Sequence, residues 1–471
     1  MNFEKNRLSI EFTTRDILTW TGGNKIQGSE NTTFNATSID TRSLREGALF
    51  VAIRGNKYDA HNFLSEAMDK KAAGLLISQR GKLPESSRKC SIIAVRDTTK
   101  ALGDIAKGHR QSFSGTLVAI TGSNGKTTTK EMCASILGVD SPCLKTSGNL
   151  NNQFGVPLTL LSRRSDHECA VIEIGMNHRG EIAPLAKIAK PNIGIITNIG
   201  TAHIEHLGSQ EEISKEKGDL VANLGPDSTA VLNADDPFVM SQSERCLGRT
   251  ITFGHENAAE VMARDVESLG DYGFSYNLVT DRGSQNVKIK GLGESTVINS
   301  LAASAGAIAA GVTLEQIQEG LHRYEPPQGR MEKILLDNNI CLIHDAYNAN
   351  PQSVRNALTS LTRLKTSNRG IAVLGDMGEL GSASPEAHRK SGELAAELGV
   401  SLLFLIGDWA EKVRAGALAN GMSSQQIMIS KDLEKLGESI REALRENDWV
   451  LIKGSRSMQM ERLVEYLVRS S

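Results

Sequence analysis

A glycine-rich loop with a lysine and adjacent threonines is the first stretch that could perform chemistry. Its residues are Gly122, Ser123, Asn124, Gly125, Lys126, Thr127 and Thr128. The loop follows an apolar run at 117–120, typical of a buried strand, and precedes apolar residues at helical spacing over 132–137. A strand, a glycine turn and a helix aim backbone N–H groups at an anion. In such a site Lys126 reaches the outer phosphates of a nucleotide, and the Thr127 hydroxyl is a ligand for Mg²⁺. The sequence therefore predicts a nucleotide-binding loop. Ile120 occupies the place of the motif's usual first glycine, and an ordinary glycine turn is the alternative.

Acidic and basic residues further along are weaker signals. Glu173 is the one acid in a predicted buried strand, 170–174, where a carboxylate costs several kcal/mol unless it is paired or bound to a metal. Solvation at the end of the strand and a metal-associated role both remain open for it. His203 lies in the loop after another predicted strand, 193–198. Lys215 and Lys217 belong to a Lys/Glu-rich helix predicted over 210–224, and that pattern alone predicts solvated surface lysines.

These residues are positioned by alternating strands and helices that divide into three α/β domains. We expect a small domain over 1–112, with a helix from Thr14 and strands near 48–53 and 73–77. A central domain of the P-loop type, with a mostly parallel sheet, is predicted over 113–325, including an antiparallel excursion at 255–292. The run Glu325-Pro326-Pro327-Gln328-Gly329 reads as a linker.

The third domain, 326–471, is predicted to be Rossmann-like, with strands at 340–344, 371–374, 402–406 and 449–452. Polar loops at 345–351, 375–381 and 453–456 follow three of these strands. The carboxyl ends of parallel strands share one edge of a sheet, so we expect the three loops to converge on one cleft.

Composition narrows the class of protein. The 471 residues carry 53 basic and 55 acidic side chains, which does not indicate nucleic-acid or anionic-membrane binding. The six cysteines form no CxxC pair, which favours buried thiols in a reducing compartment. There is no apolar signal core at the N-terminus and no run long enough to span a membrane. We therefore expect a cytoplasmic protein without membrane insertion, and a monomer.

Several motifs, in order along the whole chain, resemble those of the Mur ligases, which build the peptide of bacterial cell-wall precursors. They are ITGSNGKTTTKEM, SGNLNNQFGVPLTLL, VIEIGMNHRGEI, TNIGTAHIEHLGS with the later KEKGD, and GRMEK. In the third domain DAYNANPQS, LGDMGELG and KGSRSMQME resemble the member that performs the last step. That step joins D-alanyl-D-alanine to a UDP-N-acetylmuramoyl-tripeptide. The resemblance implies an ATP-dependent ligase that forms an acyl phosphate, which the dipeptide amine then attacks.

The resemblance also implies roles for individual residues. Lys126 and the loop amides hold the phosphates of ATP, and Thr127 and Glu173 bind one Mg²⁺. His203 matches the ligand of a second Mg²⁺, and Lys217 matches a lysine that is carbamylated in this family. Arg330 and Asp345 match residues that contact the nucleotide. The substrate side of the cleft is implied for Asn151, Asn348, Asn350, Lys453, Ser455 and Arg456. Thr41, Arg42 and the loop at 54–61 match the region that takes the UDP-sugar.

One departure from the family concerns the adenine side of the nucleotide. The family often has His-Asn before the helix that contains Asn299, and here Ser295-Thr296 takes that place. The adenine contact usually made by that Asn therefore has no matching residue here. We expect Asn299 to bind the nucleotide, with simple helix packing as the alternative. Two other functions also stay open: a relative such as a folylpolyglutamate synthase, or a non-catalytic regulator that binds nucleotide. The third residue of the tripeptide, meso-diaminopimelate or L-lysine, does not follow from the sequence.

Overall fold

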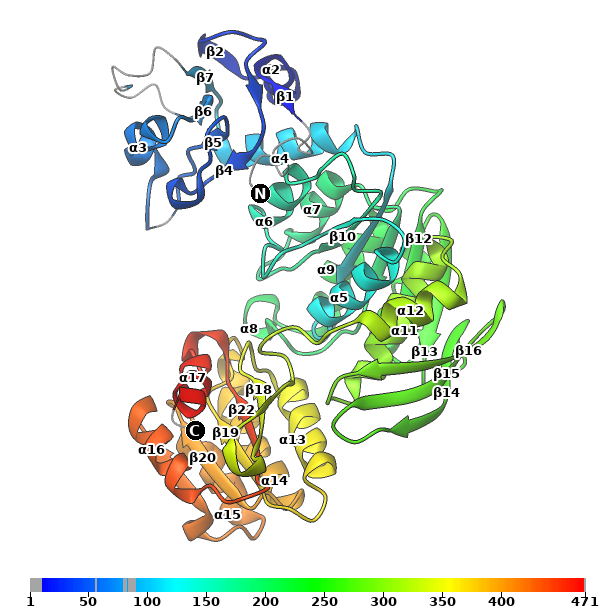
Figure 1. The fold of residues 1–471 in the computed structure, drawn as a ribbon, viewed down its shortest axis with the longest axis vertical. Helices are drawn as coiled ribbons and strands as arrows, with labels where there is room; N and C mark the ends of the chain where they lie inside the picture. Colours follow the sequence, from blue (N-terminus) through cyan, green and yellow to red (C-terminus); the bar gives the residue numbers. More distant parts are fainter. Residues whose placement is uncertain (1–10, 56, 79–82, 84–89, 470–471) are drawn as a thin grey trace.

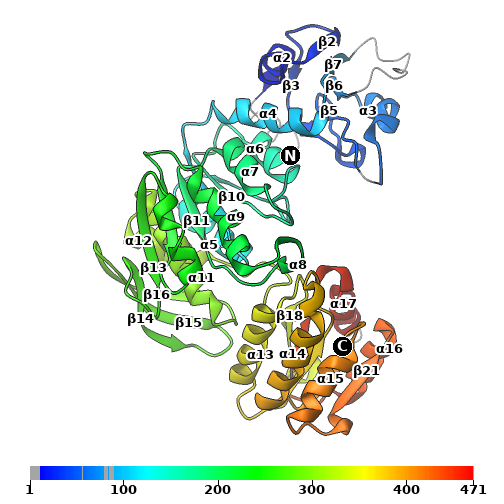
Figure 2. The same cartoon turned by 180° about the vertical axis from the view of Figure 1, so that it is seen from behind.

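The computed structural model describes residues 11–55, 57–78, 83 and 90–469. Three groups of elements follow one another along an elongated molecule, from the N-terminal group at the top of Figure 1 to the C-terminal group at the bottom. Figure 2 shows the same order from behind. Each group has its own α/β sheet, as the alternating sequence pattern predicts. None of the described helices is both long and apolar enough to cross a membrane.

The first group contains a five-stranded sheet in which only the edge strand β2 runs antiparallel to its neighbour. In sheet order the strands are β2 (Asn24–Gln27), β7 (Ser91–Ala94), β6 (Gly74–Ile77), β5 (Leu49–Val51) and β4 (Thr37–Ser38). The other elements are the β1–β3 pair (Phe12–Thr13 and Thr33–Phe34), α2 (Thr14–Thr21), α3 (Leu64–Asp69) and α4 (Thr98–Arg110). The predicted strands and the helix start at Thr14 are confirmed. Thr13 caps α2 in a capping box with Asp16, which fixes that start.

The central group is built on a nine-stranded sheet whose strands are parallel except at one end. In sheet order they are β16 (Gly283–Lys290), β15 (Gly273–Thr280), β14 (Val261–Ser268), β13 (Arg249–Gly254), β12 (Thr229–Asn233), β11 (Ile193–Ile196), β8 (Thr116–Thr121), β10 (Cys169–Glu173) and β9 (Cys143–Lys145). The predicted antiparallel excursion is confirmed, because β14, β15 and β16 pair antiparallel.

Alternate residues of the central strands face two different cores. Leu117 and Ala119 of β8 face one core, and Val118 and Ile120 face the other. The first core is covered by α6 (Gly155–Leu161), α7 (Ile182–Ala189) and α9 (Gln210–Ala222). The second is covered by α5 (Lys126–Leu137), α11 (Ser295–Ala309) and α12 (Leu314–Arg323). The short helices α8 (Ile204–Leu207) and α10 (Pro237–Met240) complete the group.

The third group has a six-stranded sheet, parallel except for its edge strand β17. The strands are β17 (Glu332–Leu335), β18 (Cys341–Asp345), β22 (Trp449–Lys453), β19 (Gly370–Leu374), β20 (Leu402–Ile406) and β21 (Ile427–Ser430). The helices are α13 (Pro351–Lys365), α14 (Ser384–Glu397), α15 (Ala410–Ala419), α16 (Leu433–Ala443) and α17 (Glu461–Arg469). All four predicted strands of this region are confirmed.

The first two groups share one continuous core through α4. Ile17 and Leu49 of the first group belong to the same apolar cluster as Leu117 and Ile172 of the second. At the end of α4, the buried Arg110 donates hydrogen bonds to Ala189 O (2.9 Å) and Lys190 O (3.1 Å) of the central group. In both views α4 lies against α6 and α7, whereas the third group joins the centre through the segment that follows α12.

Candidate active site

The predicted nucleotide-binding loop connects β8 to α5, as its sequence indicates. Gly122 and Gly125 have φ angles of +148° and +81°, in the region that favours glycine. A Cβ on Gly122 would collide with the Thr197 hydroxyl, and one on Gly125 would collide with the Asn299 side-chain oxygen. Both glycines are therefore needed for the shape of the loop and for its close packing on its neighbours.

The two residues that follow strand β11 hold the phosphate loop in place through hydrogen bonds. Asn124 N donates to Asn198 Oδ1 (2.9 Å), and the Thr197 hydroxyl donates to Asn124 O (2.6 Å). Lys126 folds back over the loop and donates to Gly122 O at 2.8 Å. Burial lowers the pKa of Lys126, and the Glu173 carboxylate partly opposes that shift. The lysine thus lies close to the carboxylate at the end of the adjacent strand β10.

Glu173 is only 2% exposed, so solvation at the strand end is the wrong interpretation of this carboxylate. Its Oε2 accepts a hydrogen bond from the Thr127 hydroxyl (2.9 Å), and its Oε1 accepts one from Asn151 Nδ2 (2.8 Å). A buried carboxylate next to a hydroxyl supplies the hard oxygen donors that Mg²⁺ prefers. Glu173 and Thr127 therefore fit a divalent cation beside the phosphate loop.

Lys217 is 1% exposed, so the expectation of a solvated lysine is wrong at this position. One face of α9 packs on the central sheet, and Lys217 lies on that face, whereas Lys215 is exposed as expected. Burial drives the pKa of Lys217 well below its ordinary value, and the positive charge of Lys126 lowers it further. Lys217 is therefore a buried amine that loses its proton easily, close to the phosphate loop.

The residue before Lys217 is a buried acid with a structural role. Glu216 is buried, and its carboxylate accepts hydrogen bonds from three successive backbone N–H groups at the start of α7 (2.8, 2.9 and 3.0 Å). A carboxylate at a helix N-terminus satisfies donors that have no partner within the helix. Sequence alone could not reveal this role, because the helix that Glu216 caps is 34 to 36 residues away.

His203 has a φ of +64° and stands at the start of α8, the short helix drawn between the second and third groups. Its Nδ1 contacts Oε2 of Glu379, which comes from the polar loop after β19 in the third group. Glu379 was not among the predicted site residues, although its loop was expected at the cleft. The His203 side chain is 17% exposed.

Asp345, Lys453 and Asn348 form one bonded group in the third sheet. Lys453 is 2% exposed and donates to Asp345 Oδ2 (2.6 Å) and to Asn348 O (3.0 Å). Asp345 Oδ1 accepts from Met331 N (3.1 Å), next to the linker. The ammonium of Lys453 therefore holds the Asp345 side chain and the Asn348 carbonyl of the polar loop that follows β18. The guanidinium of Arg330 lies over the ring of Tyr347, 4.1 Å from its centroid, in a cation–π contact.

Asn350 reaches across to the phosphate loop. It caps α13 through Ser353, and its Nδ2 donates to Asn124 Oδ1 at 2.7 Å. Ser455 Oγ lies 3.1 Å from Ser457 Oγ. Arg456 is largely exposed and pairs with Glu461 at 2.9 Å. These residues come from the ends of β18 and β22, neighbouring strands of one sheet.

A single cleft of about 1520 Å³ lies between the phosphate loop and the three polar loops of the third group. The expected convergence of these loops is therefore confirmed. The predicted residues that line the cleft are Ser123, Asn124, Gly125, Lys126, Thr127, Thr128, Asn151, Glu173, His203, Asn299, Arg330, Asp345, Asn348, Asn350, Lys453, Ser455 and Arg456. Gly122, within the loop, and the buried Lys217 are not part of the lining.

Ser295 and Thr296, which stand in place of the usual His-Asn pair, line the same cleft at the start of α11. Asn299 lies one turn later and is 5% exposed. Its side-chain oxygen is within 3.5 Å of the Thr129 hydroxyl. Asn299 thus packs against the phosphate loop and also lines the cleft, so helix packing and a place at the nucleotide site are compatible.

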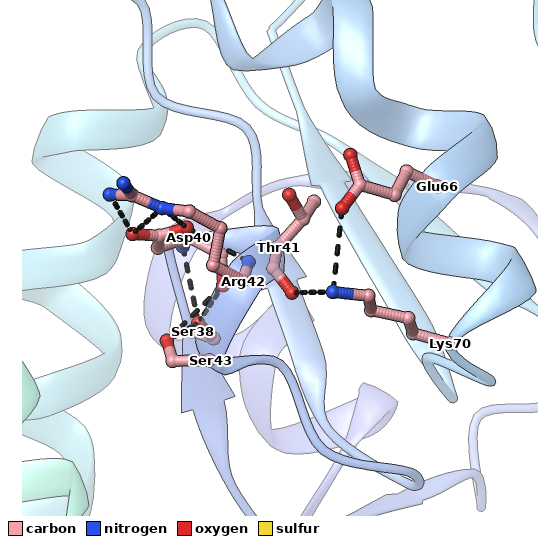
Figure 3. Close-up of polar contacts among 7 residues, drawn as sticks. All are labelled: Ser38, Asp40, Thr41, Arg42, Ser43, Glu66 and Lys70. Carbon is pink, nitrogen blue, oxygen red and sulfur yellow. Dashed lines mark hydrogen bonds and ion pairs between the residues drawn. The ribbon is translucent and has the colours of Figure 1, made fainter.

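Thr41 and Arg42 lie outside this cleft, in the first group. Figure 3 shows the Arg42 guanidinium folded onto the Asp40 carboxylate, with Nε 3.0 Å from both carboxylate oxygens. Lys70 Nζ donates to Thr41 O at 2.8 Å and pairs with Glu66 at 3.4 Å. Within the predicted loop at 54–61, residue 56 lies outside the described residues. Arg42 itself is 87% exposed at its side chain, free to meet a ligand from solvent.

Comparisons with known proteins agree with this geometry. Residues 120–307 match the Mur ligase middle domain, and residues 329–456 match the Mur ligase glutamate ligase domain. A UDP-N-acetylmuramoyl-tripeptide–D-alanyl-D-alanine ligase of Synechocystis is 36% identical, with 93% of each chain covered. A crystal structure of MurF from Acinetobacter baumannii superposes with a TM-score of 0.89 at 31% identity, covering 98% of this chain and 99% of the other. MurF ligase from Thermotoga maritima in complex with ADP gives a TM-score of 0.81 at 28% identity, covering 92% and 97%.

Proposed function

Because the chain belongs to the Mur ligase family, we propose that it joins D-alanyl-D-alanine to a UDP-N-acetylmuramoyl-tripeptide at the expense of ATP. The product would be the UDP-linked pentapeptide used in peptidoglycan synthesis. The observation that carries the proposal is the cleft in which the phosphate loop faces the loop at 347–350. Asn350 bridges the two loops through its bond to Asn124.

The reaction requires an activated carboxylate, because a free carboxylate is a poor electrophile. In the proposed sequence, the carboxylate oxygen at the end of the tripeptide attacks the γ-phosphorus of ATP, and ADP leaves. The amine of the dipeptide then attacks the acyl carbon, phosphate leaves, and an amide remains. Phosphoryl transfer depends mainly on alignment and on neutralisation of charge. Lys126 and the loop amides, which line the cleft, would supply both, and Arg330 would add a second cation there.

We propose that Thr127 and Glu173 hold one Mg²⁺, and that His203 and a carbamylated Lys217 hold a second. Bound there, Mg²⁺ would neutralise the charge on the phosphates. The donor set supports this assignment: Glu173 is buried with a hydroxyl at its side, and Lys217 is a buried amine with a lowered pKa. A carbamate would turn that amine into an anion with hard oxygens.

The remaining predicted residues are assigned to the nucleotide, to the two peptide substrates and to the UDP-sugar. We propose Asn299, Arg330 and Asp345 for the nucleotide, and Asn151, Asn348, Asn350, Lys453, Ser455 and Arg456 for the tripeptide and dipeptide. Lys453 would act by fixing Asp345 and the Asn348 carbonyl. Thr41 and Arg42 are proposed for the UDP-sugar. We also propose domain limits at 112/113 and 325/326, a cytoplasmic location and a monomeric state.

The test is phosphate release with the three substrates together and with each one omitted. The proposed ligase releases phosphate only when ATP, the UDP-tripeptide and D-alanyl-D-alanine are all present. A folylpolyglutamate-type enzyme would respond to folate and glutamate instead, and a regulator would bind ATP without releasing phosphate. Tripeptides ending in meso-diaminopimelate and in L-lysine should be compared, which also identifies the natural third residue.

A further inference from the structure

The cleft extends between helices α13 and α14 of the third domain, beyond the residues assigned to the substrates above. The two helices lie side by side in Figure 2. Both helices contribute to the lining of this part of the cleft, with Pro351 and Arg355 from α13 and Ala387, Lys390, Ser391 and Leu394 from α14. We call this part of the cleft, lined by these six residues, the α13–α14 groove.

The face of α13 that carries Arg355 is turned towards α14. Thr362 lies seven residues after Arg355, and residues seven positions apart are on nearly the same side of a helix. The Thr362 hydroxyl donates to Leu398 O, at the end of α14, at 3.2 Å. A different face of α13 meets the central domain, where Ser360 lies close to Gly293. Arg355 therefore borders the α13–α14 groove and not the part of the cleft beside Gly293.

Arg355 is the cation of this groove that has no carboxylate partner. Its exposed side chain makes no hydrogen bond or ion pair with any residue that the structure describes. The other cation, Lys390, lies 3.7 Å from Oε1 of Glu386, and both oxygens of that carboxylate accept hydrogen bonds from Arg389 (2.7 and 2.8 Å). A guanidinium without a partner at the edge of a cleft is suited to bind a carboxylate through two parallel hydrogen bonds.

The wall of the groove formed by α14 is mostly apolar. Ala387 and Leu394 are partly buried side chains that pack on the core of the third domain, so they present carbon atoms to the groove. The hydroxyl of Ser391, between them, already donates to Ala387 O at 3.0 Å. The groove therefore suits a ligand with small apolar side chains and one anionic end.

The distance along α13 matches the length of a dipeptide. Asn350 caps this helix and donates to Asn124 of the phosphate loop, so the start of α13 lies beside that loop. Arg355 is five residues further along, a rise of about 7.5 Å in an α-helix. Two extended residues span about 7 Å. A dipeptide whose carboxylate pairs with Arg355 therefore has its amine at the level of Asn350, next to the phosphate loop.

We propose that the α13–α14 groove binds the dipeptide substrate, with Arg355 paired to its terminal carboxylate and its two methyl groups against Ala387 and Leu394. The inference rests on the proposed function, because it locates the second substrate of that reaction. It also gives a reason for the choice of a dipeptide. A single amino acid held by Arg355 would have its amine about 3.5 Å short of the level of Asn350.

The test compares D-alanyl-D-alanine with D-alanyl-D-alaninamide, which has the same shape and lacks the negative charge. Phosphate release by the full chain is measured at saturating ATP and UDP-tripeptide, and kcat/KM is determined for each acceptor. A hydrogen bond to a charged group is worth about 10-fold to 100-fold in affinity, so we expect the wild type to prefer the free carboxylate by about that factor. Arg355→Gln should use the two acceptors within about threefold of each other, with the loss in the KM for the dipeptide.

The ratio of the two acceptors separates binding of the carboxylate from a general disturbance of the fold, which lowers activity with both acceptors alike. A wild type that does not distinguish the acceptors, or an Arg355→Gln variant that keeps the wild-type preference, would overturn the inference. Arg355→Lys keeps the positive charge and should retain part of the preference. A lysine variant as indifferent as the glutamine variant would count against a role for the charge.

Lys390→Gln is the matched control, because it removes the other cation of the same groove. We expect this variant to retain the preference for the free carboxylate. Loss of the preference in Lys390→Gln but not in Arg355→Gln would contradict the assignment of Arg355. If the wild type releases no phosphate with any acceptor, the proposed function fails and the inference falls with it. If the wild type ligates the dipeptide and Arg355→Gln keeps the preference, only the inference fails.

Discussion

Replacement of Lys217 tests the most demanding part of the proposed site. An ordinary lysine, with a pKa of about 10.4, is neutral in about one molecule in 1000 at pH 7.4. Carbamylation needs the neutral amine, and each unit by which burial lowers the pKa makes that form ten times more abundant. Lys217 is 1% exposed, and its pKa lies well below the ordinary value because of burial and the nearby charge of Lys126. We therefore expect the reactive form to be well populated at neutral pH.

The expected loss of activity and stability in Lys217→Ala can be estimated from the groups that the substitution removes. Loss of one charge-stabilising group in the site should lower turnover by about 10²–10³-fold, or about 2.7–4 kcal/mol. Lys217→Ala also deletes about three buried methylenes, worth about 2.4 kcal/mol of packing. Lys217→Met keeps most of that stem, so it should stay folded and still lose the activity. Lys215→Ala changes an exposed residue of the same helix and should be nearly silent.

The assay is phosphate release in buffers with and without bicarbonate, repeated with added acetate. Acetate is expected to restore part of the activity of Lys217→Ala by filling the vacant anionic position. Full activity of Lys217→Met, or a requirement for Lys215 in place of Lys217, would refute the reasoning.

The same lysine predicts a pH dependence of stability in CO₂-free buffer. Its folded pKa is depressed, so between that pKa and the unfolded value the unfolded chain binds one more proton, and the unfolding free energy rises with pH. Lys217→Met lacks this contribution. The unfolding free energy of Lys217→Met minus that of the wild type should therefore decrease as the pH rises from 7 towards about 10.4. Denaturant titrations at several pH values would measure this difference. A difference that increases over this range would mean that the amine is charged in the folded protein.

Three further predictions concern the cleft. Lys126→Ala should abolish ligation while leaving the fold intact, because it removes a phosphate-binding charge whose hydrogen bonds go to the loop carbonyls of Gly122 and Ser123 and not to the core; circular dichroism and phosphate release check this, and near wild-type turnover would contradict it. D-alanyl-D-alanine should support phosphate release where single amino acids do not, and the reverse preference would place the enzyme at an earlier step. Binding of an ATP analogue and the UDP-tripeptide should reduce the radius of gyration in X-ray scattering, because the proposed catalytic groups lie on both sides of the 325–329 linker; an unchanged radius would argue against closure.

The sequence predicted best where function depends on a short continuous segment. The phosphate loop was recognisable because strand, glycines, lysine and helix follow one another within about 20 residues. The convergence of the third-domain loops followed from the geometry of parallel strands. Burial of a helix face was harder to predict where that face carries charged residues. Lys217 and Glu216 look solvated by composition, but both are buried, and Glu216 caps the start of α7.

Contacts between segments far apart in the chain left no local signal. The bond from Asn350 to Asn124 spans 226 residues, and the contact of Glu379 with His203 joins different domains. The motif around Glu379 was visible in the sequence, but nothing in it says which side chain reaches the other domain. Such pairings depend on how the domains dock, which neither periodicity nor residue spacing encodes.

The core that the first and second domains share at α4 fixes the position of the first domain relative to the phosphate loop. Moving the first domain against the second would break the hydrogen bonds of Arg110 and uncover a continuous apolar surface, whereas the third domain meets the second through polar contacts such as that of Asn350 with Asn124. The distance from the Thr41–Arg42 corner to the phosphate loop is then set by the fold. If the first domain binds the sugar nucleotide as proposed, the length of the attached peptide determines whether its carboxylate reaches the phosphate loop. We then expect a peptide one residue shorter or longer to bind without being phosphorylated.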